Sequence, residues 1–140
     1  MHIVCPRCLD INRISHSQLS QRPKCSACHQ AMFTGHPFKL SSRNFDLILA
    51  HTDIPIAVMF WKIDCPTCKT METAYQQAAS HLEPWVRVTR VNMNQERAIP
   101  GLYKVDDAPT LLVFKNEQEV GRVSGLLTTN EIMRWVSQYV

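Results

Sequence analysis

The order of apolar and amphipathic segments predicts an α/β protein: a mixed sheet with helices on both faces, preceded by a small N-terminal module. Two observations lead to this fold class. From residue 38 onward, segments typical of strands and helices alternate three times, and two adjacent strands and a final helix follow. Before residue 38, the chain has four closely spaced cysteines, and residues 10–17, which lie between the two cysteine pairs, contain few apolar side chains. Its 140 residues suffice for one compact domain with a small appendage.

The composition excludes a disordered chain. Apolar residues make up 45% of the sequence and charged residues 19%, with four glycines and eight prolines. No uncharged apolar run reaches the about 18 residues that a membrane-spanning helix needs. The N-terminus also lacks the apolar stretch of a secretory signal. We therefore expect a soluble cytoplasmic protein, monomeric and without a membrane partner.

The boundary between module and domain is expected near residue 33. Gly35, the first glycine of the chain, and Pro37 are typical of a connection at this point. The division assigns residues 1–32 to the module and residues 33–140 to the larger domain.

The domain is expected to begin with an edge strand at residues 38–40. Ser42 is placed to cap the helix that follows. The apolar residues of this helix recur at helical spacing, and they are Phe45, Ile48 and Leu49.

The central strand and the next helix have the strongest patterns. Residues 56–61 are six consecutive apolar side chains, which is typical of a strand buried on both faces. Over residues 67–82, apolar side chains recur at helical spacing, and Pro66 suits the first turn because that turn needs no N–H group there. Cys65 would thus lie at a helix N-terminus, where free N–H groups and the helix dipole favour a thiolate.

Three further strands and two further helices complete the predicted sheet. The strands are expected at residues 86–91, 110–115 and 119–124, the last two paired as a hairpin. A short irregular helix at residues 95–103, interrupted by Pro100 and Gly101, precedes the hairpin. Thr128 and Glu131 have the spacing of a capping box for the final helix. The expected apolar face of that helix comprises Ile132, Trp135, Val136, Tyr139 and Val140.

All six cysteines fall into three pairs with two residues between the partners. The pairs are Cys5 with Cys8, Cys25 with Cys28, and Cys65 with Cys68. An even count also fits a disulfide framework, but such frameworks belong to short secreted chains. In a reducing compartment, metal binding and thiol chemistry are the better interpretations.

The first two pairs have the spacing of a structural zinc site, with 16 residues between them. Cys5, Cys8, Cys25 and Cys28 are the candidate ligands of one structural Zn²⁺. The alternative is four reduced structural cysteines, but a unit below about 40 residues usually needs a metal or a disulfide to fold. A redox-sensing role is a further alternative, since oxidation of the ligands would release the metal. The neighbouring His2 and His29 are expected to face solvent.

The N-terminal 40 residues are basic, with five Lys and Arg side chains against one acidic residue. Basic zinc modules often bind nucleic acid. Four thiolates around one Zn²⁺ would, however, cancel about two of these positive charges, and no arginine cluster with aromatic neighbours occurs. We therefore expect no nucleic-acid partner.

Several motifs together resemble the thioredoxin family. They are Trp61-Lys62-Ile63-Asp64-Cys65-Pro66-Thr67-Cys68-Lys69, Asp107-Ala108-Pro109-Thr110, Phe114-Lys115-Asn116 and Ser124-Gly125. The N-terminal cysteine pairs narrow the resemblance to the bacterial thioredoxin-2 group, and it extends over essentially the whole chain. It implies a thioredoxin fold with the order β-α-β-α-β-α-β-β-α and a zinc-ribbon-like module. It also implies a protein-disulfide reductase that receives electrons from an NADPH-dependent thioredoxin reductase and acts on disulfide-containing proteins.

The resemblance also implies roles for the cysteines of the third pair and the proline that faces them. Cys65 would be the nucleophile that forms a mixed disulfide with the substrate, and Cys68 the resolving thiol that releases it. Pro109 would be a cis-proline, so that Ala108 presents its backbone to a bound substrate strand.

Two further residues receive supporting roles from the resemblance. Trp61 would support the active-site loop, and Gly125 would leave room for the substrate backbone. From the residues alone, Trp61 equally fits the core, Pro109 an ordinary trans proline, and Gly125 a turn.

The residues between the reactive cysteines depart from the family pattern. Pro66 and Thr67 stand where the family usually has glycine and proline. A proline directly after the nucleophile is more typical of oxidising or glutathione-linked relatives, so an oxidase or isomerase with a higher redox potential is the alternative function. Thr67 is placed to donate a hydrogen bond to the Cys65 thiolate, whereas Asp64 opposes that thiolate by like charge.

A second departure concerns the central strand. Met59 stands where the family usually has a buried aspartate that assists deprotonation of the resolving cysteine, and Arg90 stands in place of the aspartate's lysine partner. We expect resolution of the mixed disulfide to be slower, or to rely on water.

Acidic residues are expected around Cys65. Asp64, Asp106 and Asp107 replace neutral or basic residues of the family and predict an acidic rim that favours basic substrates. The alternative is a solvated surface without selectivity. A non-enzymatic zinc-ribbon adaptor is a third candidate function, but a binding module needs neither a nucleophile nor a resolving thiol.

Overall fold

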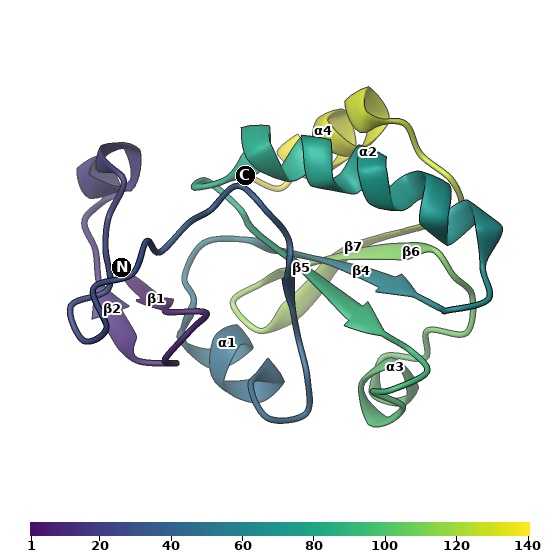
Figure 1. Cartoon of the computed structure of the whole chain (residues 1–140), viewed down its shortest axis with the longest axis horizontal. Coiled ribbons are helices and arrows are strands. Elements are labelled where there is room, and N and C mark those ends of the chain that lie inside the picture. Colours follow the sequence, from purple (N-terminus) through teal and green to yellow (C-terminus); the bar gives the residue numbers. More distant parts are fainter.

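The computed structural model describes all 140 residues, and its elements follow the predicted order (Figure 1). The strands are β1 (His2–Val4), β2 (Ile11–Arg13), β3 (Phe38–Lys39), β4 (Ile56–Trp61), β5 (Arg87–Asn92), β6 (Thr110–Lys115) and β7 (Gln118–Ser124). The helices are the 3-10 helix η1 (His16–Gln21), α1 (Phe45–His51), α2 (Pro66–Leu82), α3 (Ala98–Leu102) and α4 (Thr129–Ser137). None of them combines the length and the apolar character that crossing a membrane requires.

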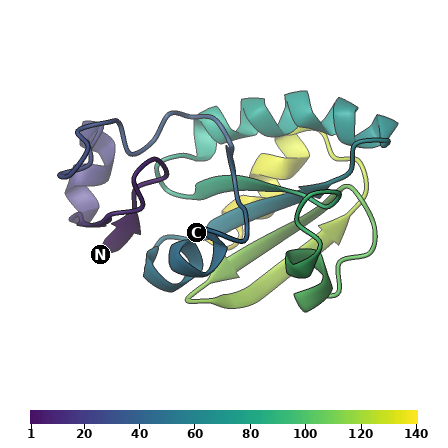
Figure 2. The ribbon, with the colours of Figure 1, turned by 60° about the horizontal axis from the view of Figure 1, so that its bottom comes forward.

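The five-stranded sheet has the order β3-β5-β4-β6-β7. Strands β3, β5 and β4 are parallel, whereas β6 is antiparallel to β4 and to β7. Helices α2 and α4 lie on one face of the sheet, and α1 and α3 lie on the other (Figures 1 and 2). The predicted mixed sheet with helices on both faces is therefore confirmed.

Each face of the sheet has its own core, and β4 contributes to both. Ala57 and Met59 pack in the cluster under α2 and α4. Ile56, Val58 and Phe60 pack in the cluster that includes residues of α1 and α3. This alternation explains why β4 is apolar at every position: both of its faces are buried.

Three helix details differ from the sequence predictions. Asn44, not Ser42, is the N-cap of α1, while the backbone N–H of Ser42 donates to Glu96 at 3.1 Å. Helix α3 is not interrupted at Pro100, because proline is tolerated in a first helical turn. Helix α4 ends at Ser137, so Val140 lies beyond it and is exposed.

The hairpin and the capping box follow the predictions more closely. The turn between β6 and β7 consists of Asn116 and Glu117, both with positive φ, as a two-residue hairpin turn requires. At the start of α4, the Thr128 hydroxyl accepts from the Glu131 N–H at 3.2 Å, and the Glu131 carboxylate accepts from the Thr128 N–H at 3.0 Å. Two backbone N–H groups that have no partner within the helix are thereby hydrogen-bonded.

The N-terminal module consists of the β1–β2 hairpin, η1 and the segments that carry the four cysteines. Its core contains only seven buried residues, namely Ile3, Cys5, Ile14, Leu19, Cys25, Met32 and Ile54. Ile54 comes from the larger domain, between α1 and β4. The module therefore completes its small core by packing against the domain. The predicted boundary between residues 32 and 33 stays a prediction.

A buried ion pair fixes the segment that joins the module to the domain. Arg87 and Glu83 are 3.3 Å apart, and each side chain is only 2% exposed. Arg87 also donates to the Met32 carbonyl at 2.9 Å, and its guanidinium lies 4.2 Å from the centre of the Phe33 ring. Glu83 accepts from the backbone N–H of Gly35 at 3.1 Å. Both charges thus hold the connecting chain against the start of β5.

Candidate active site and metal cluster

A disulfide joins Cys65 and Cys68 at the N-terminus of α2. Cys65 is the N-cap and Pro66 the first helical residue, as the sequence predicted. The Cys68 backbone N–H donates to the Cys65 sulfur at 3.1 Å. In the reduced protein, this N–H group and the helix dipole would stabilise a Cys65 thiolate.

The loop before β6 and the end of β7 adjoin Cys65. Its sulfur lies 3.7 Å from the carbonyl oxygen of Ala108, and the Ala108–Pro109 peptide bond is cis. The Gly125 N–H donates to the Pro109 carbonyl at 2.9 Å. Gly125 has φ +101°, and a Cβ atom there would meet open space. The structure thus brings together residues from three segments that are far apart in the sequence.

Acidic, basic and apolar side chains are exposed near Cys65, and the basic ones are Lys62 and Lys69. Asp64, Asp106 and Asp107 are exposed. Ile63, directly before Asp64, and Leu126, directly after Gly125, are exposed by 51% and 50%.

Thr67 lies where the sequence placed it. Its hydroxyl is 3.5 Å from the Cys65 sulfur, within reach of a hydrogen bond to sulfur. Asp64 precedes Cys65 and is exposed to solvent.

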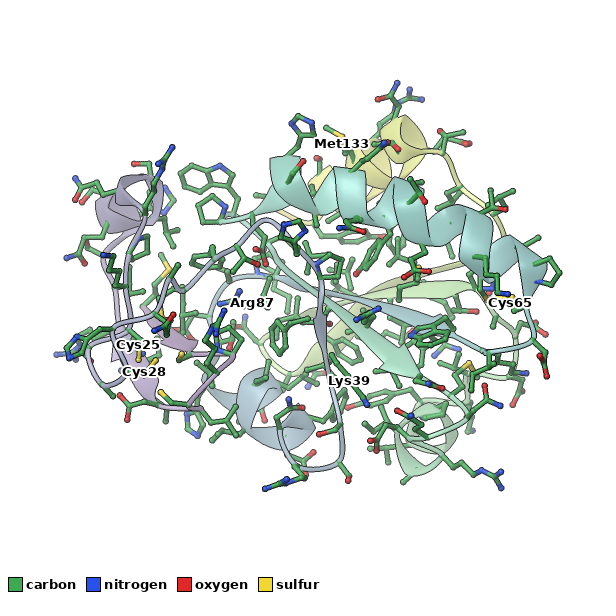
Figure 3. The ribbon with its side chains drawn as sticks, viewed as in Figure 1. Cys25, Cys28, Lys39, Cys65, Arg87 and Met133 are labelled. Atoms are coloured by element: carbon green, nitrogen blue, oxygen red, sulfur yellow. A yellow bond between two sulfur atoms is a disulfide. The ribbon has the colours of Figure 1, made fainter.

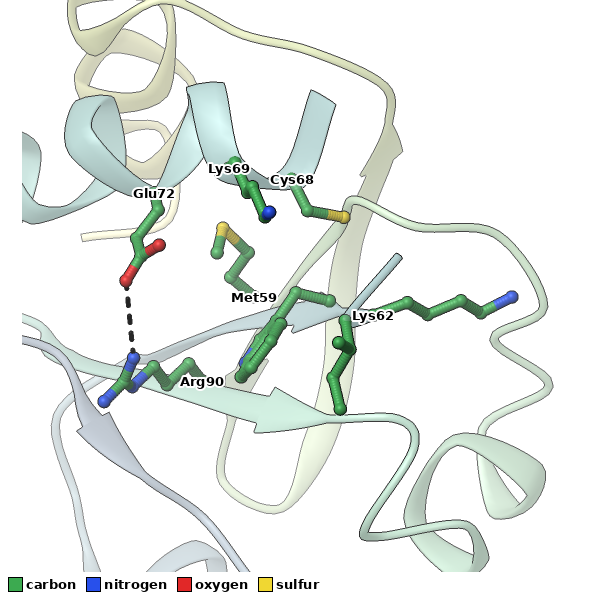
Figure 4. A pocket seen from close by; sticks show the side chains of 8 residues that line it. Met59, Lys62, Cys68, Lys69, Glu72 and Arg90 are labelled. Carbon is green, nitrogen blue, oxygen red and sulfur yellow. Dashed lines mark ion pairs between the residues drawn. The ribbon is translucent and has the colours of Figure 1, made fainter. Parts of the chain in front are cut away.

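A cavity of about 220 Å³ lies behind Cys68 (Figure 4). Met59 and Trp61 of β4 and Arg90 of β5 line it, together with Glu72 of α2. Arg90 and Glu72 form an ion pair at 3.8 Å. Four further lining residues were not predicted from the sequence, namely Lys62, Ile63, Lys69 and Glu72. For Glu72, the signal was its position one helical turn after Cys68.

The four module cysteines form a compact cluster, with all sulfur atoms within 4.8 Å of one another. The sulfurs of Cys5 and Cys28 are 3.7 Å apart, and those of Cys8 and Cys25 are 3.5 Å apart. Four thiolates around Zn²⁺, with Zn–S bonds of about 2.3 Å, would lie about 3.8 Å apart. The donor set and its spacing therefore fit a zinc ion.

The two segments that carry the cysteine pairs, residues 5–9 and 25–29, have the same backbone conformation. Each ends in a residue with φ +65°, which is Leu9 in the first and His29 in the second. The N–H group of Leu9 donates to the Cys5 carbonyl, and that of His29 donates to the Cys25 carbonyl. His29 is thus an exposed turn residue, and the Nδ1 atom of the exposed His2 lies 3.9 Å from an Asp53 carboxylate oxygen.

Hydrogen bonds within the cluster favour an anionic sulfur on Cys25. The Cys28 N–H and the Asn12 side-chain amide lower the pKa of Cys25 to about 6. The amide nitrogen of Asn12 is 3.4 Å from the Cys25 sulfur. A thiolate is the form that binds a metal.

A disulfide-forming pair at a helix N-terminus, facing a cis-proline on this fold, defines a thiol–disulfide oxidoreductase. The family model "Thioredoxin" matches residues 36–138, and the model "Thioredoxin 2, N-terminal" matches residues 4–30. The chain belongs to the thioredoxin family, and its N-terminal segment is the zinc-ribbon module of thioredoxin 2.

Curated relatives agree with this assignment. Thioredoxin C-3 of Corynebacterium nephridii is 31% identical over 138 residues, which cover 99% of this chain and 94% of the relative. The thioredoxins of Haemophilus influenzae and Rickettsia bellii are 27% and 25% identical over 101 residues, covering 72% of this chain and 94% and 96% of their own lengths. The first alignment therefore includes the N-terminal module.

Proposed function

We propose that the protein is a protein-disulfide reductase in which Cys65 is the nucleophile and Cys68 the resolving thiol. The observation that carries this proposal is the position of the pair: Cys65 at the helix N-terminus beside Ala108, and Cys68 behind it with 3% of its surface exposed. The more accessible sulfur meets the substrate, and the buried sulfur attacks it from within.

The reaction consists of two exchanges. The Cys65 thiolate attacks a substrate disulfide, so that a mixed disulfide forms and one substrate sulfur leaves as a thiolate. The Cys68 thiolate then attacks the Cys65 sulfur, which forms the intramolecular disulfide and releases the second substrate sulfur. The two-electron reduction of the Cys65–Cys68 disulfide by a thioredoxin reductase, with NADPH as the electron source, would complete the cycle.

Gly125, Ala108 and Pro109 would bind the substrate backbone. The open space at Gly125 and the half-buried position of Ala108 before β6 support this role, because an extended segment can lie beside Gly125 without meeting a side chain. Trp61 would hold the loop before α2, since it lines the cavity beneath Cys68.

One structural Zn²⁺ would be held by Cys5, Cys8, Cys25 and Cys28. When bound, it closes the module through four thiolate bonds and needs no open coordination position. The cluster lies in the module, away from the Cys65–Cys68 pair (Figure 3). We assign it to folding of the module, and we place the working protein in a reducing compartment such as the cytoplasm.

The test is reduction of insulin in the presence of NADPH and thioredoxin reductase. The wild-type protein should consume NADPH and precipitate the insulin B chain, whereas Cys65→Ser and Cys68→Ser should not. Absence of turnover by the wild-type protein would contradict the reductase assignment.

An oxidase or isomerase is the second candidate, favoured by the contact of Thr67 with Cys65. A stabilised Cys65 thiolate stabilises the reduced form and raises the redox potential. Equilibration with glutathione buffers measures the redox potential of the Cys65–Cys68 pair and distinguishes the two functions. The potential should be about −270 mV for a reductase and about −120 mV for a strong oxidant.

A further inference from the structure

The cavity behind Cys68 contains one carboxylate among several cations. Its eight lining residues are Met59, Trp61, Lys62, Ile63, Cys68, Lys69, Glu72 and Arg90. Glu72 is the only carboxylate among them, and the other charged residues are two lysines and one arginine. Figure 4 shows Glu72 and Cys68 on the same side of α2, with Met59 of β4 opposite.

Resolution of a mixed disulfide requires that Cys68 lose its proton. An ordinary thiol has a pKa of about 8.5, so most of it is protonated at neutral pH. Cys68 is 3% exposed, which separates it from bulk solvent. Met59, its neighbour in the cavity, has no acid–base chemistry. A proton acceptor within the cavity would therefore increase the rate of resolution.

Glu72 lines the cavity and is also exposed to solvent, because 58% of its side chain and 39% of the Arg90 side chain are exposed. Arg90 holds a Glu72 oxygen at 3.8 Å, and the Arg90 Nε atom is buried without a protein hydrogen-bond acceptor. A cavity of about 220 Å³ has room for water molecules, and water is the partner that such a buried donor usually finds. Water can thus connect Glu72 with the sulfur one helical turn away.

We propose that Glu72, acting through cavity water, accepts the proton of Cys68 during resolution of the mixed disulfide. The proton passes to the Glu72 carboxylate, and the Cys68 sulfur attacks Cys65. The Cys65–Cys68 bond forms as the bond between Cys65 and the substrate breaks. The bonding electron pair leaves on the substrate sulfur, and Glu72 returns its proton to solvent. The inference rests on the proposed roles of Cys65 and Cys68.

The other charged and titratable groups around this pair come from several elements. They are Lys62 in the loop after β4, Asp64 before α2, Lys69 and Tyr75 on α2, Arg90 on β5, His36 before β3, and Asp107 before β6. Tyr75 donates its proton to the Thr89 carbonyl at 2.6 Å, and burial and the Glu83 charge raise its pKa further. His36 is hydrogen-bonded to Gln76 on the exposed side of Glu72. Glu72 remains the carboxylate that shares the cavity with Cys68.

Glu72→Gln should change the rate of resolution in opposite directions, depending on whether Glu72 accepts the proton or acts only through its negative charge. A carboxylate that acts only through its charge disfavours the Cys68 thiolate, so its removal would accelerate resolution near neutral pH. A carboxylate that accepts the proton accelerates resolution, so its removal would slow it. The sign of the change in rate therefore separates the two.

The experiment measures resolution directly by stopped-flow absorbance with reduced protein and 2,2′-dithiodipyridine, an uncharged disulfide. Attack by Cys65 releases one 2-thiopyridone at a rate proportional to the probe concentration, and attack by Cys68 releases a second at a rate independent of that concentration. The double variant Cys65→Ser/Cys68→Ser gives the background from the module cysteines. Cys68→Ser should release one equivalent only; a persistent second release there would overturn the proposed roles themselves.

For Glu72→Gln, we expect the second phase to slow by about ten-fold at about pH 6.5, with the first phase nearly unchanged. The difference should diminish at high pH, because hydroxide then removes the Cys68 proton without the carboxylate. Glu72→Asp should recover part of the rate, and Glu117→Gln, which removes a carboxylate in the hairpin turn, should match the wild type. A second phase that is unchanged or faster in Glu72→Gln would overturn the proposal.

Discussion

Replacing Arg87 by methionine tests how firmly the buried ion pair joins the module to the domain. The substitution keeps most of the side-chain volume but removes the charge that faces Glu83 at 3.3 Å. It also removes the hydrogen bond to the Met32 carbonyl and the contact with the Phe33 ring. Glu83 would remain buried, with two backbone N–H groups as its hydrogen-bond donors.

The expected loss follows from the burial of both side chains, each 2% exposed. Removing one partner of a buried pair leaves an uncompensated charge and costs about 3–5 kcal/mol of unfolding free energy. Arg122→Met is the matched control: its pair with Glu119 is shorter, at 2.8 Å, but about a third of each side chain is exposed. Exposed pairs contribute about 0–1 kcal/mol, so this control should lose much less.

The loss in Arg87→Met should also depend on pH. Burial raises the pKa of Glu83, and Arg87 is the strongest influence that opposes the shift. In the variant, the folded-state pKa of Glu83 therefore rises further above its unfolded value of about 4.3. The folded variant then binds more protons than the unfolded chain. The contribution of Glu83 to the unfolding free energy is therefore most favourable below about pH 4, and it decreases as the pH rises through the folded-state pKa.

Urea unfolding of the zinc-loaded protein, followed by tryptophan fluorescence at several pH values, measures both effects. We expect a large difference in unfolding free energy between wild type and Arg87→Met at neutral pH and a smaller one in acid. A loss no greater than that of Arg122→Met, or a loss that grows as the pH falls, would refute the reasoning.

Further predictions concern the reactive sulfurs and the metal. Met59→Asp should accelerate decay of the mixed disulfide between about pH 6 and 8, since it adds an acceptor near the cavity; an unchanged rate would contradict this. Thr67→Val should raise the pKa of reduced Cys65, measured by the pH dependence of its alkylation by iodoacetamide, and an unshifted profile would exclude a hydrogen bond. Zinc removal by a chelator should abolish hydrogen-exchange protection in the module but not in α2. Asp64→Asn should diminish any preference for basic over acidic peptide disulfides at low salt, and the same preference in both proteins would assign Asp64 no role.

The sequence predicts those parts of the fold that depend on local pattern. The run of apolar residues in β4 and the spacing in α2 located the strand, the helix and Cys65 between them. The cap of α1 was predicted wrongly, because Asn44 begins the helix without a side-chain cap bond and instead accepts from the Ser41 N–H at 2.7 Å. The Ser42 N–H donates to Glu96, which is distant in the sequence.

The charged residues that matter most were not predictable in this way. Nothing local to Glu83 and Arg87 indicates that residues 32–38 fold over them and bury their charges. The spacing of Cys68 and Glu72 places both on one helix face, but the cavity exists only because β4 and β5 supply its other wall. The reactive cysteines could be predicted because their spacing is a local feature of the sequence. Glu72 could not, because its neighbours in the cavity come from distant strands.

The distribution of the six cysteines separates two kinds of sulfur chemistry within one chain. The module cluster and the Cys65–Cys68 pair lie at opposite ends of the molecule (Figure 3). Thiolates close to a reactive disulfide would exchange with it and scramble the pairing. Distance prevents this inside one molecule, so the dithiol pair can be oxidised and reduced repeatedly while the other four sulfurs keep their partners.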